Sequence, residues 1–254
     1  MPYTFSFIAN AGFTRSCFNN IMSCSLPTCF LPLSYGSIAP GATAAAFPMF
    51  GTTNAASTAA ATSADWPARL GGLAVAVVDS AGISRSAQIT YASPTQVNYV
   101  VLAGTAAGKA AVRFTVNGTT ATGSLNVVAT YPTLFPVNAP GLAAAYVLRS
   151  VSQQVTTVYQ IEGGKVVAQP VSVGTSADPA YLVLVGSCLG SATSATVTIG
   201  GVSTTVSYAG TQLTYKGLDQ YNILIPASLA GRGSVDVVVT VAGKPSNVVN
   251  VTIQ

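Results

Sequence analysis

The stretch that decides the fold is PTQVNYVVLAGTAAGKAAVRFTVNGTTATGSLNVVA, residues 94–129. Apolar and polar residues alternate along it, and Val, Thr and Tyr are frequent, a pattern that suits half-buried β-strands. An Asn117-Gly118 pair separates two of the alternating runs, and this dipeptide is a strong signal for a two-residue hairpin turn. The stretch therefore predicts short antiparallel strands joined by tight turns.

A second stretch, LDQYNILIPASLAGRGSVDVVVTVAGKPSNVVNVTIQ at residues 218–254, repeats this plan. The offset from Gln96 to Gln220 is 124 residues, which is the size of a domain and not of a solenoid repeat. The corresponding positions are Gln96 and Gln220, Asn98 and Asn222, Gly108 and Gly231, and the turns Asn117-Gly118 and Ala242-Gly243. We therefore predict an all-β protein with two tandem immunoglobulin-like β-sandwich domains.

The segment TYPTLFPVNAPG, residues 130–141, carries three prolines and is expected to be extended and stiff between the domains. Residues 1–32 are predicted to be a poorly defined N-terminal segment. The first domain is predicted at residues 33–131 and the second at residues 132–254. An inserted hairpin near residues 143–172, turning at Glu162-Gly163-Gly164-Lys165, is expected to cover an edge or to bridge the domains.

Charge is scarce, since only 6% of the residues are Asp, Glu, Lys or Arg against about a quarter in ordinary domains. The surface must then consist of Thr, Ser, Asn, Gln, Gly and Ala, as on secreted proteins and on proteins that pack side by side. The ten basic residues form no cluster, which argues against nucleic-acid binding. Nor does any apolar run have the length of a transmembrane segment.

Several motifs, taken in order, carry a resemblance to a known family: LGGLAVAV, YASPTQVNYVV, GTAAGKAAVRFTV, DPAYLVLVGSCLG, GLDQYNILIPASLAGRG and VTVAGKPSNVVNVTIQ. Together with flanking residues they resemble, over roughly residues 33–254, the uncharacterised bacterial carboxy-terminal domain family named after Solibacter. The single units also look like the IPT/TIG group of immunoglobulin-like folds. The resemblance implies an exported bacterial protein in which this domain ends a longer polypeptide. Cys188 departs from the small residue of that family at the same place.

Few residues offer chemistry. The chain has no histidine, which removes Ser-His-Asp and Cys-His catalysis and histidine metal sites. The six acidic residues are each isolated in sequence, and turn-forming or edge-solubilising roles are expected for Asp79, Asp178 and Asp219. We therefore predict no catalytic residue, no cofactor and no bound metal.

The cysteines are unevenly distributed. Cys17, Cys24 and Cys29 lie near the start of the chain, at spacings that do not suit zinc, and whether they form a disulfide stays open. Cys188 is alone in the second half, and we expect it to be a small buried apolar residue.

Four amides are candidate interaction residues. Gln96, Asn98, Gln220 and Asn222 alternate with apolar residues and should lie on one side of their strands. One interpretation is a polar surface for a ligand or partner. The other, which we favour because a structural requirement would be duplicated with the fold, is that these amides satisfy backbone groups at the mouth of each sandwich.

Aromatic residues are the second set of candidates. A stacking face for a sugar would be formed by Trp66, Tyr91, Tyr99, Tyr208, Tyr215 and Tyr221. Core and rim positions are the expected alternative for these rings.

The functional expectation is a non-catalytic extracellular or cell-surface module, such as a stalk, an adhesive segment or a subunit of a surface assembly. Its expected partners are other protein chains or surface polymers, including further copies of itself. No export signal is visible in the sequence. The alternative is a carbohydrate-binding module that serves a separate enzyme, with Trp66 as a stacking residue. An independent enzyme is the third hypothesis.

Overall fold

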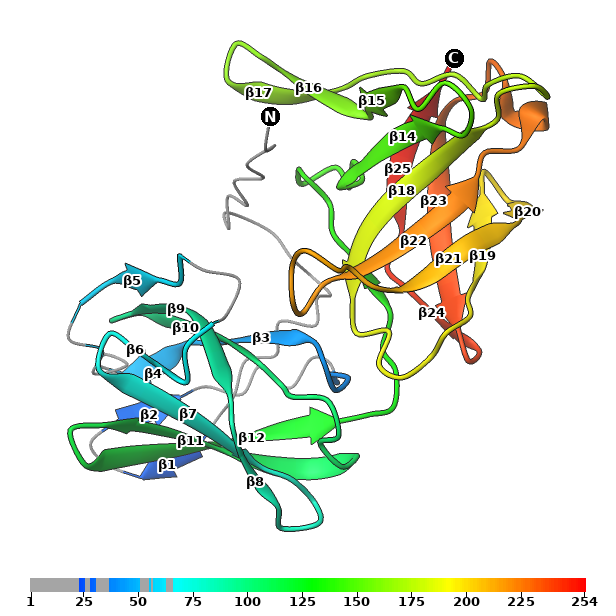
Figure 1. Ribbon diagram of the computed structural model, residues 1–254. Helices are drawn as coiled ribbons and strands as arrows, with labels where there is room; N and C mark the ends of the chain where they lie inside the picture. Colours follow the sequence, from blue (N-terminus) through cyan, green and yellow to red (C-terminus); the bar gives the residue numbers. More distant parts are fainter. Residues whose placement is uncertain (1–22, 26–27, 31–36, 51–54, 56, 63–65) are drawn as a thin grey trace.

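The computed structural model describes residues 23–25, 28–30, 37–50, 55, 57–62 and 66–254. In these residues strands dominate, every paired strand is antiparallel, and the only helix is a single 3-10 turn, η1 (Ala227–Leu229). The prediction of an all-β protein is confirmed. Figure 1 shows the sheets of the first half in blue to green and those of the second half in green to red.

Two sheets enclose the first apolar core. One has the order β3-β10-β9-β5, and the other has the order β12-β11-β7-β6 with β8 beside β7. Their bounds are β3 (Thr43–Ala46), β5 (Ala59–Ala60), β6 (Arg69–Leu70), β7 (Leu73–Val78), β8 (Ser84–Ser86), β9 (Gln88–Ser93), β10 (Gln96–Val100), β11 (Gly108–Val116) and β12 (Thr119–Val127). A further small sheet contains β1 (Ser23–Ser25), β2 (Thr28–Phe30) and β4 (Pro48–Phe50).

The alternation in the sequence explains this core. Along β7 and β11 every second residue is buried, so Leu73, Val75 and Val77 face the same interior as Val112 and Phe114. Since successive side chains of a strand point to opposite faces, the intervening residues, such as Ala74 on β7 and Arg113 on β11, lie on the outer face. The Asn117-Gly118 turn predicted between β11 and β12 is confirmed, and both residues have positive φ as a type I′ turn requires.

A second pair of sheets encloses the second core. The larger has the order β15-β14-β18-β22-β21 with β13 beside β18, and the other has β20-β19-β23-β24 with β25 beside β23. Their bounds are β13 (Thr133–Leu134), β14 (Ala145–Arg149), β15 (Val155–Thr157), β18 (Ala180–Ser187), β19 (Thr196–Ile199), β20 (Val202–Thr204), β21 (Val206–Thr211), β22 (Asp219–Leu224), β23 (Gly233–Val241), β24 (Lys244–Pro245) and β25 (Val249–Ile253). Residues from both sheets, such as Leu182 and Val237, are fully buried between them.

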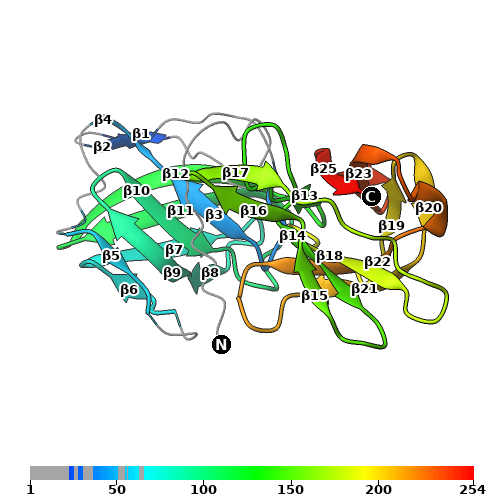
Figure 2. The same ribbon diagram turned by 90° about the horizontal axis from the view of Figure 1, so that it is seen from above.

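The segment near residues 143–172 differs from a single long hairpin. Its first part, β14, lies inside the larger sheet next to β18. The expected turn at Glu162–Lys165 forms, but it joins β16 (Tyr159–Glu162) to β17 (Lys165–Ala168) in a separate two-stranded sheet. Figure 1 shows this hairpin reaching out from the second half, in line with β15, and Figure 2 shows it from above.

The two halves repeat each other strand by strand. The pairs β3 and β18, β7 and β19, β9 and β21, β10 and β22, β11 and β23, and β12 and β25 occupy the same places in their sheets. Even an irregularity is shared, because both β9 and β21 carry a register shift one residue before a tyrosine, at Thr90 and at Ser207. The hydroxyls of these two residues donate to the carbonyls of Asn98 and Asn222, at 3.4 and 3.2 Å.

Candidate functional site

Each half carries the same pair of amides on the outer face of a sheet. Gln96 and Asn98 lie on β10, and Gln220 and Asn222 lie on β22, all partly exposed and alternating with buried residues. In the first half Gln96 Nε2 donates to Asn98 Oδ1 at 2.7 Å, and in the second Gln220 Nε2 donates to Asn222 Oδ1 at 2.8 Å. The structure therefore places the four predicted residues in two matching pairs, one in each half.

The pairing differs from the role that we favoured for these amides. In the described part of the chain, none of the four side chains hydrogen bonds to a backbone group, and each glutamine bonds only to its asparagine. The Nδ2 group of each asparagine and the Oε1 atom of each glutamine have no protein partner among the described residues. Each pair thus offers a donor and an acceptor on the outer face.

A tyrosine lies across from each asparagine on the neighbouring strand. Tyr91 on β9 is opposite Asn98, and Tyr208 on β21 is opposite Asn222. Tyr91 is partly buried, while Tyr208 is 37% exposed and its hydroxyl donates to the Thr211 carbonyl at 2.6 Å. The correspondence of these tyrosines was missed in the sequence, although QITYAS at 88–93 and TVSYAG at 205–210 align without a gap.

The other aromatic candidates do not gather around the amides. Tyr99 and Tyr221 are fully buried core residues, and burial raises the pKa of both hydroxyls. Tyr215 is 42% exposed and lies in the loop between β21 and β22. Trp66 is partly exposed next to Pro67, whose carbonyl accepts from the Ile89 amide at the start of β9. Of the predicted core and rim positions, Tyr99 and Tyr221 occupy core positions, and the other rings are partly or largely exposed.

Asp79 forms a turn, as expected. Its Oδ1 atom accepts from the amides of Ala81 and Ile83, each at 3.0 Å. The Oδ2 atom accepts from the Ala106 amide at 3.1 Å and pairs with the Arg85 guanidinium. These hydrogen bonds, the Ala106 bond above all, lower the Asp79 pKa to about 2. The carboxylate ties the β7–β8 turn to the loop before β11.

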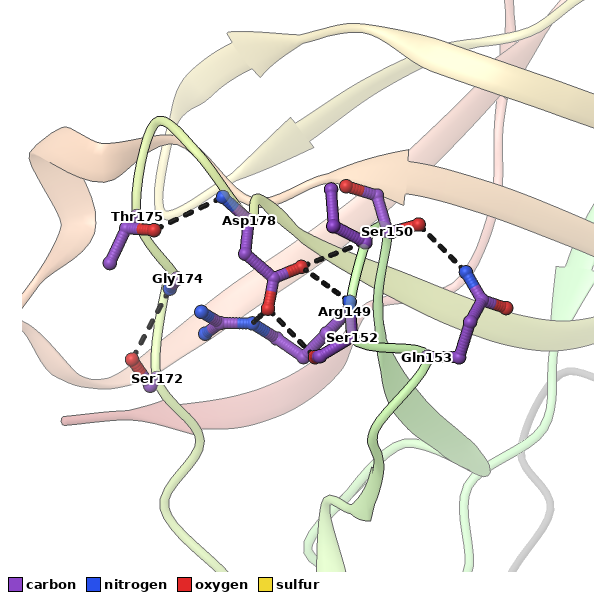
Figure 3. A network of polar contacts seen from close by, with 9 residues as sticks. Arg149, Ser150, Ser152, Gln153, Ser172, Gly174, Thr175 and Asp178 are labelled. Carbon is purple, nitrogen blue, oxygen red and sulfur yellow. Dashed lines mark hydrogen bonds and ion pairs between the residues drawn. The ribbon is translucent and has the colours of Figure 1, made fainter.

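Asp178 does the same in the second half, as Figure 3 shows. Its Oδ1 atom accepts from the amides of Val151 at 2.8 Å and Ser152 at 3.3 Å. The Oδ2 atom accepts from the Ser152 hydroxyl at 2.7 Å and pairs with Arg149 Nε at 3.3 Å. These donors lower the Asp178 pKa to about 2, and the Ser152 hydroxyl has the largest effect. Its carboxylate is therefore occupied in holding the β14–β15 turn.

Asp219 is different, because it is buried beside the loop that follows β18. Only 7% of the residue is exposed, and its Oδ2 atom accepts from the Leu189 amide at 2.6 Å. Burial raises the Asp219 pKa to about 6, and the Leu189 bond opposes that rise. Its role is to hold the loop after β18 rather than to form a turn of its own.

The raised pKa of Asp219 makes stability depend on pH in a predictable direction. Between about pH 4 and pH 6 the folded chain holds a proton that the unfolded chain, with a pKa of 3.8, has released. The free energy of unfolding therefore falls as the pH rises through this window, by about 2 to 3 kcal/mol. The lowered pKa values of Asp79 and Asp178 have the opposite effect on the free energy of unfolding. Their contribution to stability is lost only as the pH falls below about 4.

Urea unfolding at pH 4.5 and pH 7.5 measures this effect. We expect the wild-type chain to be more stable at pH 4.5, and Asp219→Asn to remove most of the difference, because the amide keeps an acceptor for Leu189 without a charge. Asp236→Asn, which changes an exposed carboxylate on β23, is the matched control and should keep the wild-type dependence. An unchanged pH dependence in Asp219→Asn would contradict the assignment.

The loop after β18 also corrects the expectation for Cys188. Cys188 is buried, as predicted, but it is disulfide-bonded and packs in the core of the first half. Its carbonyl accepts from the Tyr131 amide at 2.8 Å, which fixes the loop against the connecting segment. The partner of the disulfide, and the predictions for Cys17, Cys24 and Cys29, lie outside the residues whose side chains are described.

Two other kinds of site have no candidate in the described part of the chain. Among the described residues there is no group of three or more Cys, Asp or Glu side chains placed to hold a metal ion. In the same residues no helix has the length and apolar character to cross a membrane. No protein-family model matches the chain, and no curated protein matches it either.

Proposed function

We propose that the chain is a non-catalytic interaction module of the bacterial exterior, built from two immunoglobulin-like sandwiches. The observation that carries this proposal is the repeated outer-face cluster, which we call the amide-tyrosine cluster: Gln96, Asn98 and Tyr91 in the first half, and Gln220, Asn222 and Tyr208 in the second. The amide groups of both pairs lie on the outer face and make no hydrogen bond to the backbone of the described residues. Two equal clusters on one chain suit a partner that presents a repeated feature.

The architecture supports the same proposal. Each apolar core lies between two antiparallel sheets, the arrangement found in immunoglobulin-like domains. Asp79 and Asp178 are each saturated by several donors and so stabilise turns. The sequence resemblance to the Solibacter-type and IPT/TIG families suggests an exported bacterial setting. A stalk, an adhesive segment or a subunit of a surface assembly fits these features.

Sedimentation velocity across a wide range of protein concentration tests the proposal. We expect concentration-dependent self-association that Asn98→Ala with Asn222→Ala weakens by about five-fold or more, the effect of losing a hydrogen bond at each cluster. Thr122→Ala with Thr252→Ala is the matched control, since these are partly exposed residues of β12 and β25, in the opposite sheets. A chain that remains monomeric throughout would contradict self-association.

A carbohydrate-binding module is the second candidate, and the clusters favour it for a specific reason. A donor and an acceptor side by side, with a tyrosine nearby, can bind the neighbouring hydroxyls and the apolar face of a sugar ring. A glycan array probed with the wild-type chain and with Tyr208→Ala distinguishes this candidate. Binding to a defined glycan that the variant loses supports it, and an empty array opposes it.

A further inference from the structure

The two halves differ at one edge, and the difference identifies a binding site. In the first half β9 is not an edge strand, because β5 pairs with it. Ala59 and Ala60 of β5 lie opposite Ala92 and Tyr91, and the Ala61 amide donates to the Thr90 carbonyl at 2.9 Å. In the second half the corresponding strand, β21, has β22 on one side and no strand on the other among the described residues.

The cause of this difference is the length of one loop. The segment between β3 and β7 covers residues 47–72 and supplies β5. The corresponding segment between β18 and β19 covers only residues 188–195 and contains no strand. The shorter loop passes beside β21 without pairing with it, so the outer edge of β21 keeps the backbone groups that in the first half are used by β5.

A groove runs between this loop and the open edge. Its volume is about 540 Å³, and it is lined by residues 189–195 on one side and residues 206–211 on the other. Ser207, Tyr208 and Ala209 line it, and they correspond to Thr90, Tyr91 and Ala92, the residues that bind β5 in the first half. The groove thus occupies the place of the missing strand.

The chemistry of the groove limits what can fill it. None of the lining residues is charged, and apart from Tyr208, Val206 and Leu189 all are Gly, Ala, Ser or Thr. The strand that fills the equivalent edge is itself part of an uncharged run, STAAAT at residues 57–62. A charged or bulky segment would lose solvation or collide there, whereas a small uncharged one can form the backbone ladder.

We propose that the edge of β21 binds an extended, uncharged segment rich in Ala, Ser and Thr from a different protein chain, by antiparallel strand addition. This inference rests on the proposed function and names the partner of an adjoining surface, which shares Tyr208 with the amide-tyrosine cluster. A second copy of this chain is a poorer donor, because its own run at residues 57–62 is already paired with β9. The edges at β15 and β20 are less suitable, since these strands have three residues each whereas β21 has six.

Titration of the isotope-labelled full chain with a synthetic peptide tests the proposal by nuclear magnetic resonance. The probe is AASTAAATSA, the sequence of residues 55–64, with blocked ends. We expect amide shifts confined to residues 189–195 and 206–211, with a dissociation constant of about 0.1 to 1 mM. A peptide that is N-methylated at the position of Ala61 lacks the donor used in the first half and should bind about five-fold more weakly or worse.

A pair of variants locates the site. Ser207→Lys places a charge in the groove and should weaken binding by about five-fold or more, as lysine on an edge strand opposes strand addition. Ser203→Lys is the matched control, because Ser203 is equally an exposed serine of an edge strand, β20, on the other sheet. It should bind as the wild type does.

Four results would overturn the proposal. The first is the absence of shifts at residues 206–211, and the second is equal binding of the N-methylated peptide. The third is a set of shifts at β9 and β5, which would mean that the peptide replaces the chain's own strand. The fourth is a set of shifts at β21 that grow with protein concentration alone, which would identify a second copy as the occupant. None of these results alters the sedimentation of the amide variants, so the two proposals fail separately.

Discussion

Gly190→Ala should lower the free energy of unfolding by about 3 to 5 kcal/mol, since a left-handed conformation and a steric collision act together. Gly190 has φ of +69°, a region that residues with a side chain rarely adopt. A Cβ atom there would lie 1.9 Å from the backbone oxygen of Ala129 and 3.4 Å from the Ala39 Cβ atom. The obstacle is main chain of the connecting segment, which cannot move aside as a flexible side chain can.

Gly201→Ala is the matched control for this prediction. Gly201 has a similar φ of +79°, but a Cβ atom at that position meets nothing within 4 Å. We expect a loss of only about 1 to 2 kcal/mol from the conformation alone. Urea unfolding of both variants at one pH gives the comparison, and equal losses would show that the close approach of Gly190 to Ala129 is absent in solution.

Cys188→Ala should cost about 2 to 5 kcal/mol, the usual range for the loss of a native disulfide. Cys188 is disulfide-bonded and buried in the first core although it belongs to the second half. Because the other cysteines of the chain all precede residue 30, a bond within the chain closes a long loop, and long loops gain most from closure in the chain-entropy account.

Thiol titration of the denatured, unreduced protein checks the bond itself. Cys188→Ala should release one more reactive thiol per chain than the wild type, namely that of the former partner. Cys188→Ser should give the same thiol count, and its stability separates the loss of the bond from the loss of apolar packing. If the wild type instead shows one more reactive thiol than either variant, Cys188 is not bonded.

Much of the fold could be read from local patterns. The alternation in LAVAVV at β7 and in GSVDVVVTV at β23 predicts which face of each strand is buried. The reason is that every second side chain of a strand points to the same face. The turn at Asn117-Gly118 needs only two residues with positive φ. For the same reason the sequence places Gln96 and Asn98 on one face correctly.

What could not be predicted depends on contacts between distant residues. Nothing near Asp219 in the sequence indicates burial or the bond to the Leu189 amide, which comes from a loop 30 residues earlier in the chain. Cys188 was expected to be an ordinary core residue, and a period-two pattern cannot tell which of two cores a residue enters. The open edge of β21 likewise arises because the short loop at residues 188–195 contains no strand. A strand that is absent leaves no sequence motif to recognise.

The position of Cys188 has a consequence for the order of events during protein synthesis. The ribosome makes the first half before the second, and domains generally fold as they emerge. Here the first core contains Cys188, which is synthesised after all the strands of the first half. It lies some sixty positions beyond the end of β12 at Val127. The first half therefore lacks one side chain of its core until residue 188 has been synthesised. We expect chaperones to stay bound to the nascent chain until residue 188 has left the exit tunnel.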